Sequence, residues 1–535
     1  MINRAMVLGA LWATILGVTI LPVRAEPLEI RSTNFIFVGD VREDDALKLV
    51  KDLEIYRATV LALAGLNSRT EVRPVRIYGV GSGKEISKFT NMSNIGGVYT
   101  LRDDYPVFVM VSDGGFDDED FSRHVALHEY AHHIIGSYTE EYFPHWFNEG
   151  FAEYIAAFKV EGDLVSIGMP TSRFGNILQN KNWMDIDTVL NAITRYPDFG
   201  GANRVRFMRG NMFYGISWIA VHYIQNTPEL SSRLGDYIGL INQGVEPTEA
   251  FEKGFGITQD EFADLLRDYW RANRFASVQF RYTEEIFKDT IEVRRLDRQD
   301  FDLIMLGGKR IFYPHGDDGK KARRTIARNL DDLEERHGPA PVIARARMAL
   351  ALSAKDHGDA VARGEAAIAA FPGSPDAHLT AGDAYYHRYA DTEDPDPVDL
   401  EKARYHLGEV VKADPTNPTA TGHYISTFTF DRSQPDALAL GAVDFLASYR
   451  RNPVFWQTHL ELGEVLLLAG EPERACSHIA KVAQWVRRDA ERAAEEAANR
   501  DEPDEEAKDT FSSETSIDRL NRLLETPGFE CPTEP

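Results

Sequence analysis

The second half of the chain is constrained most strongly by proline, which recurs where amphipathic helical patterns stop. From Ala340 onward the sequence is rich in alanine, and the stretches AIAAFPGSP, VVKADPTNP and ASYRRNP each close such a pattern. Their last prolines, Pro375, Pro418 and Pro453, are about 43 and then about 35 residues apart, close to the length of a helical repeat unit. Proline cannot continue a helix but can start one. We therefore predict stacked helical hairpins over residues 336–490, with one insertion at HRYADTEDPDP.

The small and aromatic residues of this region resemble those of the tetratricopeptide family. One unit carries Gly382, Tyr385, Ala403 and His406 at the corresponding places, and the next unit but one carries Trp456, Gly463 and Ala475. The resemblance implies a surface for a protein partner, whereas a generic helical array would show the same periodicity and stays an alternative. Beyond residue 490 the acidic stretch DEPDEEAKD predicts a partly disordered tail over residues 491–535.

The first 25 residues have the pattern of a targeting segment. Arg4 precedes a long uncharged stretch, and Val23 and Ala25 are the small residues that a signal peptidase requires. We expect a secretory signal cleaved after Ala25, with an uncleaved membrane anchor as the alternative. Either form places the rest of the chain outside the cytoplasm, so the expected location is secreted or periplasmic, with no stable membrane span after cleavage.

Composition excludes some classes of function. With 535 residues the chain is long enough for two or three domains, and its formal net charge of -25 argues against nucleic acid or an anionic membrane as the main partner. Two cysteines, Cys476 and Cys531, are too few and too far apart for a zinc–thiolate site. In an oxidising compartment they could form one disulfide or stay two separate thiols, and the sequence leaves both open.

The region before the helical array alternates between strand and helix patterns. NFIFVGD (34–40), RPVRIYGV (73–80), GGVYT and PVFVMVSD read as strands, and a long amphipathic helix ending at Gly65 separates the first two. Residues 144–277 are mainly helical in pattern. We assign residues 26–280 to one α+β domain and residues 281–335 to a connecting segment of undecided structure.

The residues with the clearest chemical meaning are His128, Glu129 and His132, which spell H-E-x-x-H. Residues four apart lie on one face of a helix, so the two imidazoles can share one metal ion. A hydrolytic zinc site needs a third protein ligand. Glu149, within PHWFNEGFAEY, is a carboxylate on an apolar helix and would need a charge partner if buried, which a zinc ion could supply. Glu153, one turn further on, competes for the same role.

H-E-x-x-H followed at short range by N-E-G-F-A-E resembles the gluzincin metallopeptidases, in particular the bacterial peptidase-MA-like proteins. The resemblance covers roughly residues 34–274 and implies a zincin-like fold, Zn²⁺ as cofactor and a peptide or protein substrate. It implies that His128, His132 and Glu149 bind zinc and that Glu129 is the general base. Glu153 would accept a hydrogen bond from a ligand imidazole. The GGVYT strand lacks the glutamate with which related aminopeptidases bind an amino terminus, so that activity is not expected.

Gluzincins often stabilise the oxyanion with a tyrosine from a later helix, and Tyr214 is the candidate, against a simple packing role. His124, His133 and His145 are interpreted as bystanders of the motif. The expected fold is therefore a zincin-like α+β catalytic domain followed by an all-α repeat domain. The expected function is that of a zinc peptidase. Two alternatives stay open: an inert scaffold acting through its repeats, and a zinc hydrolase of a non-peptide cell-envelope substrate.

Overall fold

The first part of the chain is organised around a six-stranded mixed sheet. The computed structural model describes residues 26–66, 71–92, 97–100, 106–111, 121–170, 174, 178–179, 183–193, 203–283, 291–315, 319–498 and 515–532, so the predicted signal segment lies outside the described residues. The sheet order is β4-β5-β3-β2-β1-β9. The strands are β1 (Glu26–Arg31), β2 (Phe35–Val41), β3 (Val75–Val80), β4 (Gly97–Thr100), β5 (Val107–Val111) and β9 (Glu292–Arg295).

Helices cover both faces of this sheet, which explains its apolar sequence. On β2, Phe35 and Phe37 pack towards α1 (Glu43–Leu63) and α3 (Phe121–Tyr138). Ile36 and Val38 point the other way, towards α2 (Gly83–Thr90) and α12 (Arg298–Lys309). Strands buried on both faces carry continuous apolar runs, and β2, β3 and β5 are accordingly the parallel strands of the sheet. The undecided stretch after residue 280 therefore adds an edge strand and a covering helix to this sheet.

A helical layer and a small second sheet complete this part. Its helices are α4 (His145–Ala156), α6 (Ile186–Leu190), α7 (Asn203–Asn226), α8 (Pro228–Ser231), α9 (Leu234–Asn242), α10 (Pro247–Phe255) and α11 (Gln259–Ala272). The second sheet has the order β6-β7-β8, formed by β6 (Lys159–Glu161), β7 (Leu164–Ile167) and β8 (Val278–Arg281). The helical interpretation of residues 144–277 missed the β6–β7 hairpin, whose turn contains Gly162 at a positive φ of 64°.

The second part is an array of helices in which each packs against the next. Its members are α13 (Lys320–His337), α14 (Pro341–Ser353), α15 (His357–Ala370), α16 (Pro375–Ala390), α17 (Pro397–Ala413), α18 (Pro418–Asp431), α19 (Ala437–Tyr449), α20 (Trp456–Leu468) and α21 (Pro472–Ala498). Short 3₁₀ turns, η2 (Arg310–Phe312) and η4 (Pro453–Phe455), precede α13 and α20. Pro375 and Pro418 stand at the first helical positions, as the sequence predicted. The α+β class with a helical-array part is confirmed.

Small residues allow the helices of the array to approach closely. A Cβ atom on Gly382 would lie 2.8 Å from the Leu407 side chain, and one on Gly463 would lie 2.7 Å from that of Ile479. After α21, a last helix, α22 (Ser516–Leu524), packs on α20 and α21. A disulfide between Cys476 and Cys531 joins this segment to α21, which decides the question that the sequence left open.

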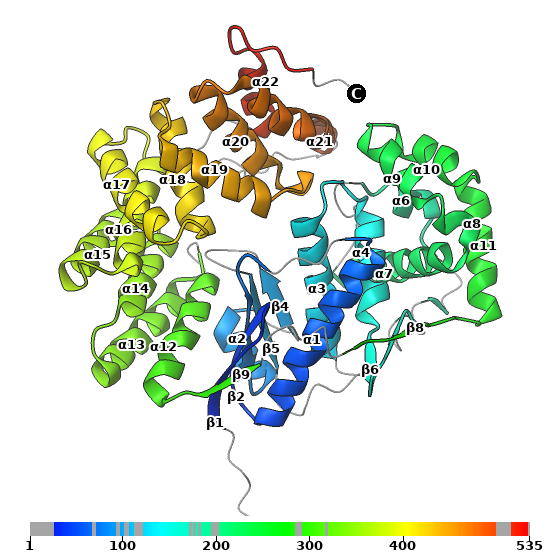
Figure 1. Ribbon diagram of the computed structural model, residues 1–535, viewed down its shortest axis with the longest axis horizontal. Coiled ribbons are helices and arrows are strands. Elements are labelled where there is room, and N and C mark those ends of the chain that lie inside the picture. Colours follow the sequence, from blue (N-terminus) through cyan, green and yellow to red (C-terminus); the bar gives the residue numbers. More distant parts are fainter. Residues whose placement is uncertain are drawn as a thin grey trace, which may run out of the picture.

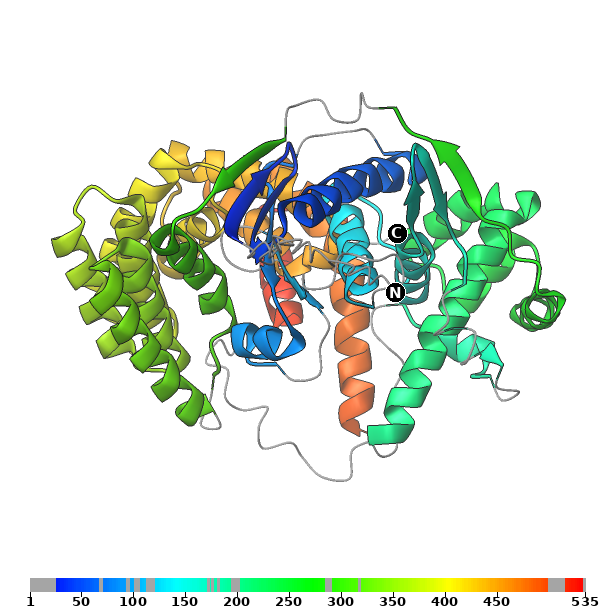
Figure 2. The same ribbon diagram turned by 90° about the horizontal axis from the view of Figure 1, so that it is seen from below.

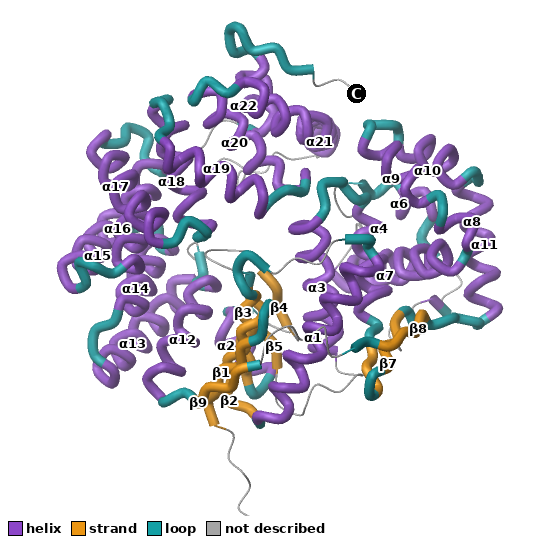
Figure 3. The backbone as a smooth tube through the Cα atoms, viewed as in Figure 1, coloured by secondary structure: helices purple, strands orange, loops and turns teal. Residues whose placement is uncertain are grey.

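The array curves so that both its ends contact the first part. Figures 1 and 2 show it running from α13, beside α12, around to α21. Residues of α21 contact the loop before α4 and the end of α9. The tube in Figure 3 shows that the strands are confined to the first part and that the array is helical throughout. Among the described residues, no helix has the length and apolar character needed to cross a membrane.

Candidate metal centre

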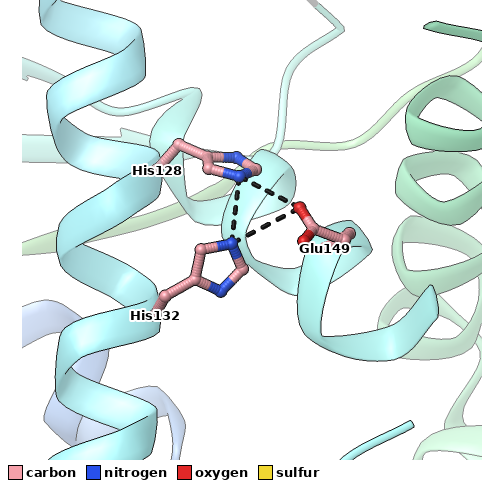
Figure 4. A group of neighbouring side chains, drawn as sticks. All are labelled: His128, His132 and Glu149. Atoms are coloured by element: carbon pink, nitrogen blue, oxygen red, sulfur yellow. Dashed lines mark hydrogen bonds and ion pairs between the residues drawn. The ribbon is translucent and has the colours of Figure 1, made fainter. Parts of the chain in front are cut away.

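His128 and His132 lie one turn apart on α3, and α4 crosses this helix so that Glu149 faces them. The Nε2 atoms of the two histidines are 3.0 Å apart. Glu149 Oε2 lies 3.1 Å from the first nitrogen and 3.4 Å from the second. Figure 4 shows the three side chains converging from the two helices on one point. The structure thus brings together the three residues expected to bind the metal.

These distances fit a tetrahedral metal ion. Ligand bonds of about 2.0–2.1 Å at tetrahedral angles place neighbouring donor atoms about 3.3 Å apart. The three atoms are close enough that a proton or a metal ion must lie between them, because three unprotonated acceptors would repel one another. Among the residues that the structure describes, this trio is the group of His, Cys, Asp and Glu whose donor atoms lie within 4.8 Å of one another. Two imidazoles and one carboxylate are one of the donor sets that hold catalytic zinc.

Surrounding carboxylates make the centre favourable for a cation. Burial lowers the pKa of His128, but the charges of Glu153, Glu149 and Glu129 outweigh it and raise the pKa to about 9. Burial alone would raise the pKa of Glu149, but the two nearby histidines outweigh burial and hold this pKa well below its usual value. Both effects have the same origin, because three carboxylates surround two imidazoles. Any cation that replaces the shared proton is stabilised by the same excess negative charge.

Each ligand imidazole has an oxygen near its outer nitrogen. Asn148 Oδ1 lies 3.1 Å from His132 Nδ1, so that this nitrogen can donate while Nε2 keeps its lone pair towards the centre. Glu153 Oε1 lies 3.6 Å from His128 Nδ1, and its other oxygen lies 2.7 Å from His124 Nε2. Glu153 was expected here from the sequence, whereas Asn148 was not, although it directly precedes Glu149 in the N-E-G segment.

The two remaining candidates, Glu129 and Tyr214, also lie near the centre. Glu129 follows His128 on α3, is partly exposed, and is close enough to contribute to the raised pKa of that histidine. Tyr214 comes from α7, and its ring centroid lies 6.0 Å from that of His128 in an edge-on arrangement. Tyr214 can approach His128 because α4 and α7 cross closely. At this crossing, a Cβ on Gly150 would lie only 2.2 Å from the Ser217 carbonyl oxygen. Glycine in N-E-G is therefore needed for packing.

The other histidines of the region do not belong to the trio. His124 pairs with Glu153. His133 is buried, with Nδ1 2.6 Å from the Tyr99 hydroxyl and Nε2 3.4 Å from Glu71 Oε2. His145 Nε2 lies 3.8 Å from the second oxygen of Glu149.

A cavity of about 410 Å³ opens beside His132 and Glu149. Its walls come from β4, the second half of α3, the start of α4 and, unexpectedly, the helical array. The lining residues are Tyr99, His132, His133, Ile135, Gly136, Ser137, Tyr142, Phe143, His145, Asn148, Glu149, Asn452 and Phe455. Every site residue expected from the sequence lies before residue 215. No pattern in the sequence indicates Asn452 and Phe455, because more than three hundred residues separate them from the motif.

Comparison with known proteins adds little to this geometry. No protein-family model matches the chain, and no curated protein matches it either. Among solved structures, the chain is similar to a thermophilic TPR protein of Thermus thermophilus, at 14% sequence identity and a TM-score of 0.24. The match covers 37% of this chain and 92% of that one. A likeness this weak does not bear on activity.

Proposed function

We propose that this protein is a zinc-dependent peptidase with a zincin-like catalytic domain and a tetratricopeptide-like array. The observation that carries the proposal is the convergence of His128, His132 and Glu149, whose donor atoms are 3.0–3.4 Å apart within a motif that also provides a carboxylate, Glu129. A sheet with an antiparallel edge strand beside the motif helix supports the zincin-like fold.

Each candidate side chain has a separate role in the proposed reaction. His128, His132 and Glu149 would hold zinc, which supplies Lewis acidity that lowers the pKa of water and polarises the scissile carbonyl. Glu129 takes a proton from the attacking water as its oxygen bonds to the carbonyl carbon. When the C–N bond breaks, Glu129 returns that proton to the leaving nitrogen. Tyr214, beside His128, is the candidate donor to the oxyanion.

The disulfide supports the expected location outside the cytoplasm. Cys476 and Cys531 are joined across 55 residues of sequence, and such bonds form and persist in oxidising compartments. We propose a secreted or periplasmic protein acting on peptides or proteins, with the array as a surface for a substrate or partner.

The decisive experiment combines metal analysis of the purified protein with cleavage of a peptide library. We expect about one zinc per chain. Glu129→Gln should retain that zinc and lower hydrolysis by about 10²–10⁴-fold, because only the proton transfer is lost. His132→Ala should lose both zinc and activity. Hydrolysis at the wild-type rate by Glu129→Gln would contradict the mechanism. Zinc binding without peptide cleavage would favour a different hydrolase substrate or an inert scaffold.

A further inference from the structure

The turn before α20 lies directly against the C-terminal half of the motif helix. Phe455, in η4, faces Gly136 on α3, and a Cβ on that glycine would lie 3.8 Å from two atoms of the Phe455 ring. Gly136 comes four residues after His132, so the ring lies about one helical turn from a metal-ligand candidate. Both residues line the cavity beside the metal centre.

Asn452 fixes this turn to the loop that joins the two ligand-bearing helices. Its Nδ2 donates to Thr139 Oγ1 at 2.9 Å and to the carbonyl of Glu141 at 2.8 Å. Asn452 is only 4% exposed, so these bonds are shielded from water. The turn therefore has a defined position relative to α3 and α4.

Further contacts from α21 hold the same loop. Trp485 is fully buried and stacks on Tyr142, with ring centroids 4.0 Å apart. Lys481 Nζ lies 3.3 Å from Glu140 Oε2 in this loop. Gln484 Nε2 donates to the carbonyl of Asn242, the last residue of α9, at 2.7 Å. The array and the ligand-bearing helices consequently form one continuous packed unit around the cavity.

The cavity is suited to a large apolar side chain. Its walls contain five large apolar or aromatic side chains, those of Tyr99, Ile135, Tyr142, Phe143 and Phe455, together with polar groups that include His132 and Glu149. At about 410 Å³ it falls within the usual size range of ligand pockets. A peptide bond held at the metal centre would place a neighbouring side chain at the mouth of this cavity.

We propose that the array completes the substrate pocket and that Phe455 determines its specificity, selecting peptides with a large apolar or aromatic residue next to the cleaved bond. This inference rests on the proposed peptidase function and extends it, because it assigns the recognition of the substrate side chain to the second part of the chain.

The test uses the full chain and a decapeptide library in which each position around the cleaved bond is varied. Phe455→Ala should reduce the kcat/KM ratio of phenylalanine-containing over alanine-containing peptides by about 10-fold or more, since pocket contacts of this kind discriminate by 10- to 200-fold. Gly136→Ala adds a methyl group to the same cavity beside the Phe455 ring and should disfavour the largest aromatic side chains. Zinc content, measured in each variant, reports whether the metal centre is intact.

Phe430→Ala is the matched control. Phe430 is an aromatic residue of α18 that is 37% exposed and does not line the cavity, so its removal should leave the preference unchanged. A preference unaltered by both Phe455→Ala and Gly136→Ala, with cleavage intact, would overturn the inference and leave the peptidase proposal standing.

A binding measurement separates the two proposals. In the Glu129→Gln background, calorimetry with one phenylalanine peptide and its alanine analogue reports recognition without turnover. Tighter binding of the phenylalanine peptide that Phe455→Ala abolishes supports the proposed pocket. If the wild type binds selectively in this way but cleaves neither peptide, the peptidase proposal fails and the pocket proposal stands. Equal affinity for both peptides, or no binding of either, overturns the inference.

Discussion

Two buried glutamates one turn apart on α4 have different surroundings, and these surroundings favour Glu149 as the candidate ligand. Glu149 is 5% exposed and has an oxygen close to both motif histidines. Glu153 is 2% exposed, pairs with His124, and approaches His128 at the far nitrogen of its ring. Sequence spacing alone could not separate them, since both lie on the same face of the helix.

We therefore predict that Glu149→Ala abolishes tight zinc binding. Glu153→Ala should weaken it only about 10- to 100-fold, as the loss of a residue that orients a ligand does. Competition with a chelator of known affinity measures both constants, with wild type and Asp44→Ala, an exposed change in α1, as references. The opposite order of affinities would exchange the two assignments.

At the scale of elements, α22 is held to the array by charge as well as by the disulfide. Glu464 on α20 is 3% exposed and accepts hydrogen bonds from Arg519 and Arg522 of α22 at 2.7–3.3 Å. Burial raises the pKa of Glu464, but the two arginines outweigh it and bring the pKa below 4.5. The last helix thus packs on the folded array, a contact that the prediction of an acidic, partly disordered tail over residues 491–535 did not include.

This arrangement predicts a pH dependence for α22. Because the folded-state pKa of Glu464 is depressed, its stabilising contribution is present above the ordinary pKa of 4.5 and is lost as the pH falls through the lower folded value. Glu464→Gln should destabilise α22 by about 1.5–3 kcal/mol at neutral pH. It should also weaken the acid dependence below pH 4.5. Hydrogen exchange of residues 516–524 measures both effects, and an unchanged acid profile would contradict the assignment.

For the whole molecule, the contact between α21 and the loop before α4 joins the two parts. Three residues of α21 contact the first part of the chain. Trp485 stacks on Tyr142, Gln484 donates to the Asn242 carbonyl, and Arg488 donates to the Gly244 carbonyl at 2.6 Å. Near α18, Arg73 forms an ion pair with Asp414 at 2.7 Å. Such contacts indicate that the array and the α+β part unfold together.

We predict that Trp485→Ala lowers the free energy of unfolding by about 3–5 kcal/mol, the usual cost of removing a buried tryptophan. It should also separate a single thermal transition into two, because the contact that couples the two parts is lost. Scanning calorimetry measures this, with Phe430→Ala as a control on an exposed aromatic residue. A single transition at the wild-type temperature would show that Trp485 does not couple them.

Much of the local structure could be predicted from the sequence because it depends on neighbouring residues. Helical periodicity places His128 and His132 on one face whatever surrounds them, and proline at a first helical position marks α16 and α18 wherever they pack. The strands β2 and β3, the long helix α1 and the helical array follow from the same short-range patterns.

Tertiary structure decided the features that depend on distant residues. The way α4 packs on α3 brings Glu149, not Glu153, close to His132, and it brings Asn148 to the outer nitrogen of the same ring. Strand β9 pairs with β1, from which most of the first part separates it in sequence. Phe455 contacts Gly136 only because the array curves back to the motif helix. Periodicity repeats every few residues and carries no information about such partners; they are chosen by shape and charge once the helices and strands pack together.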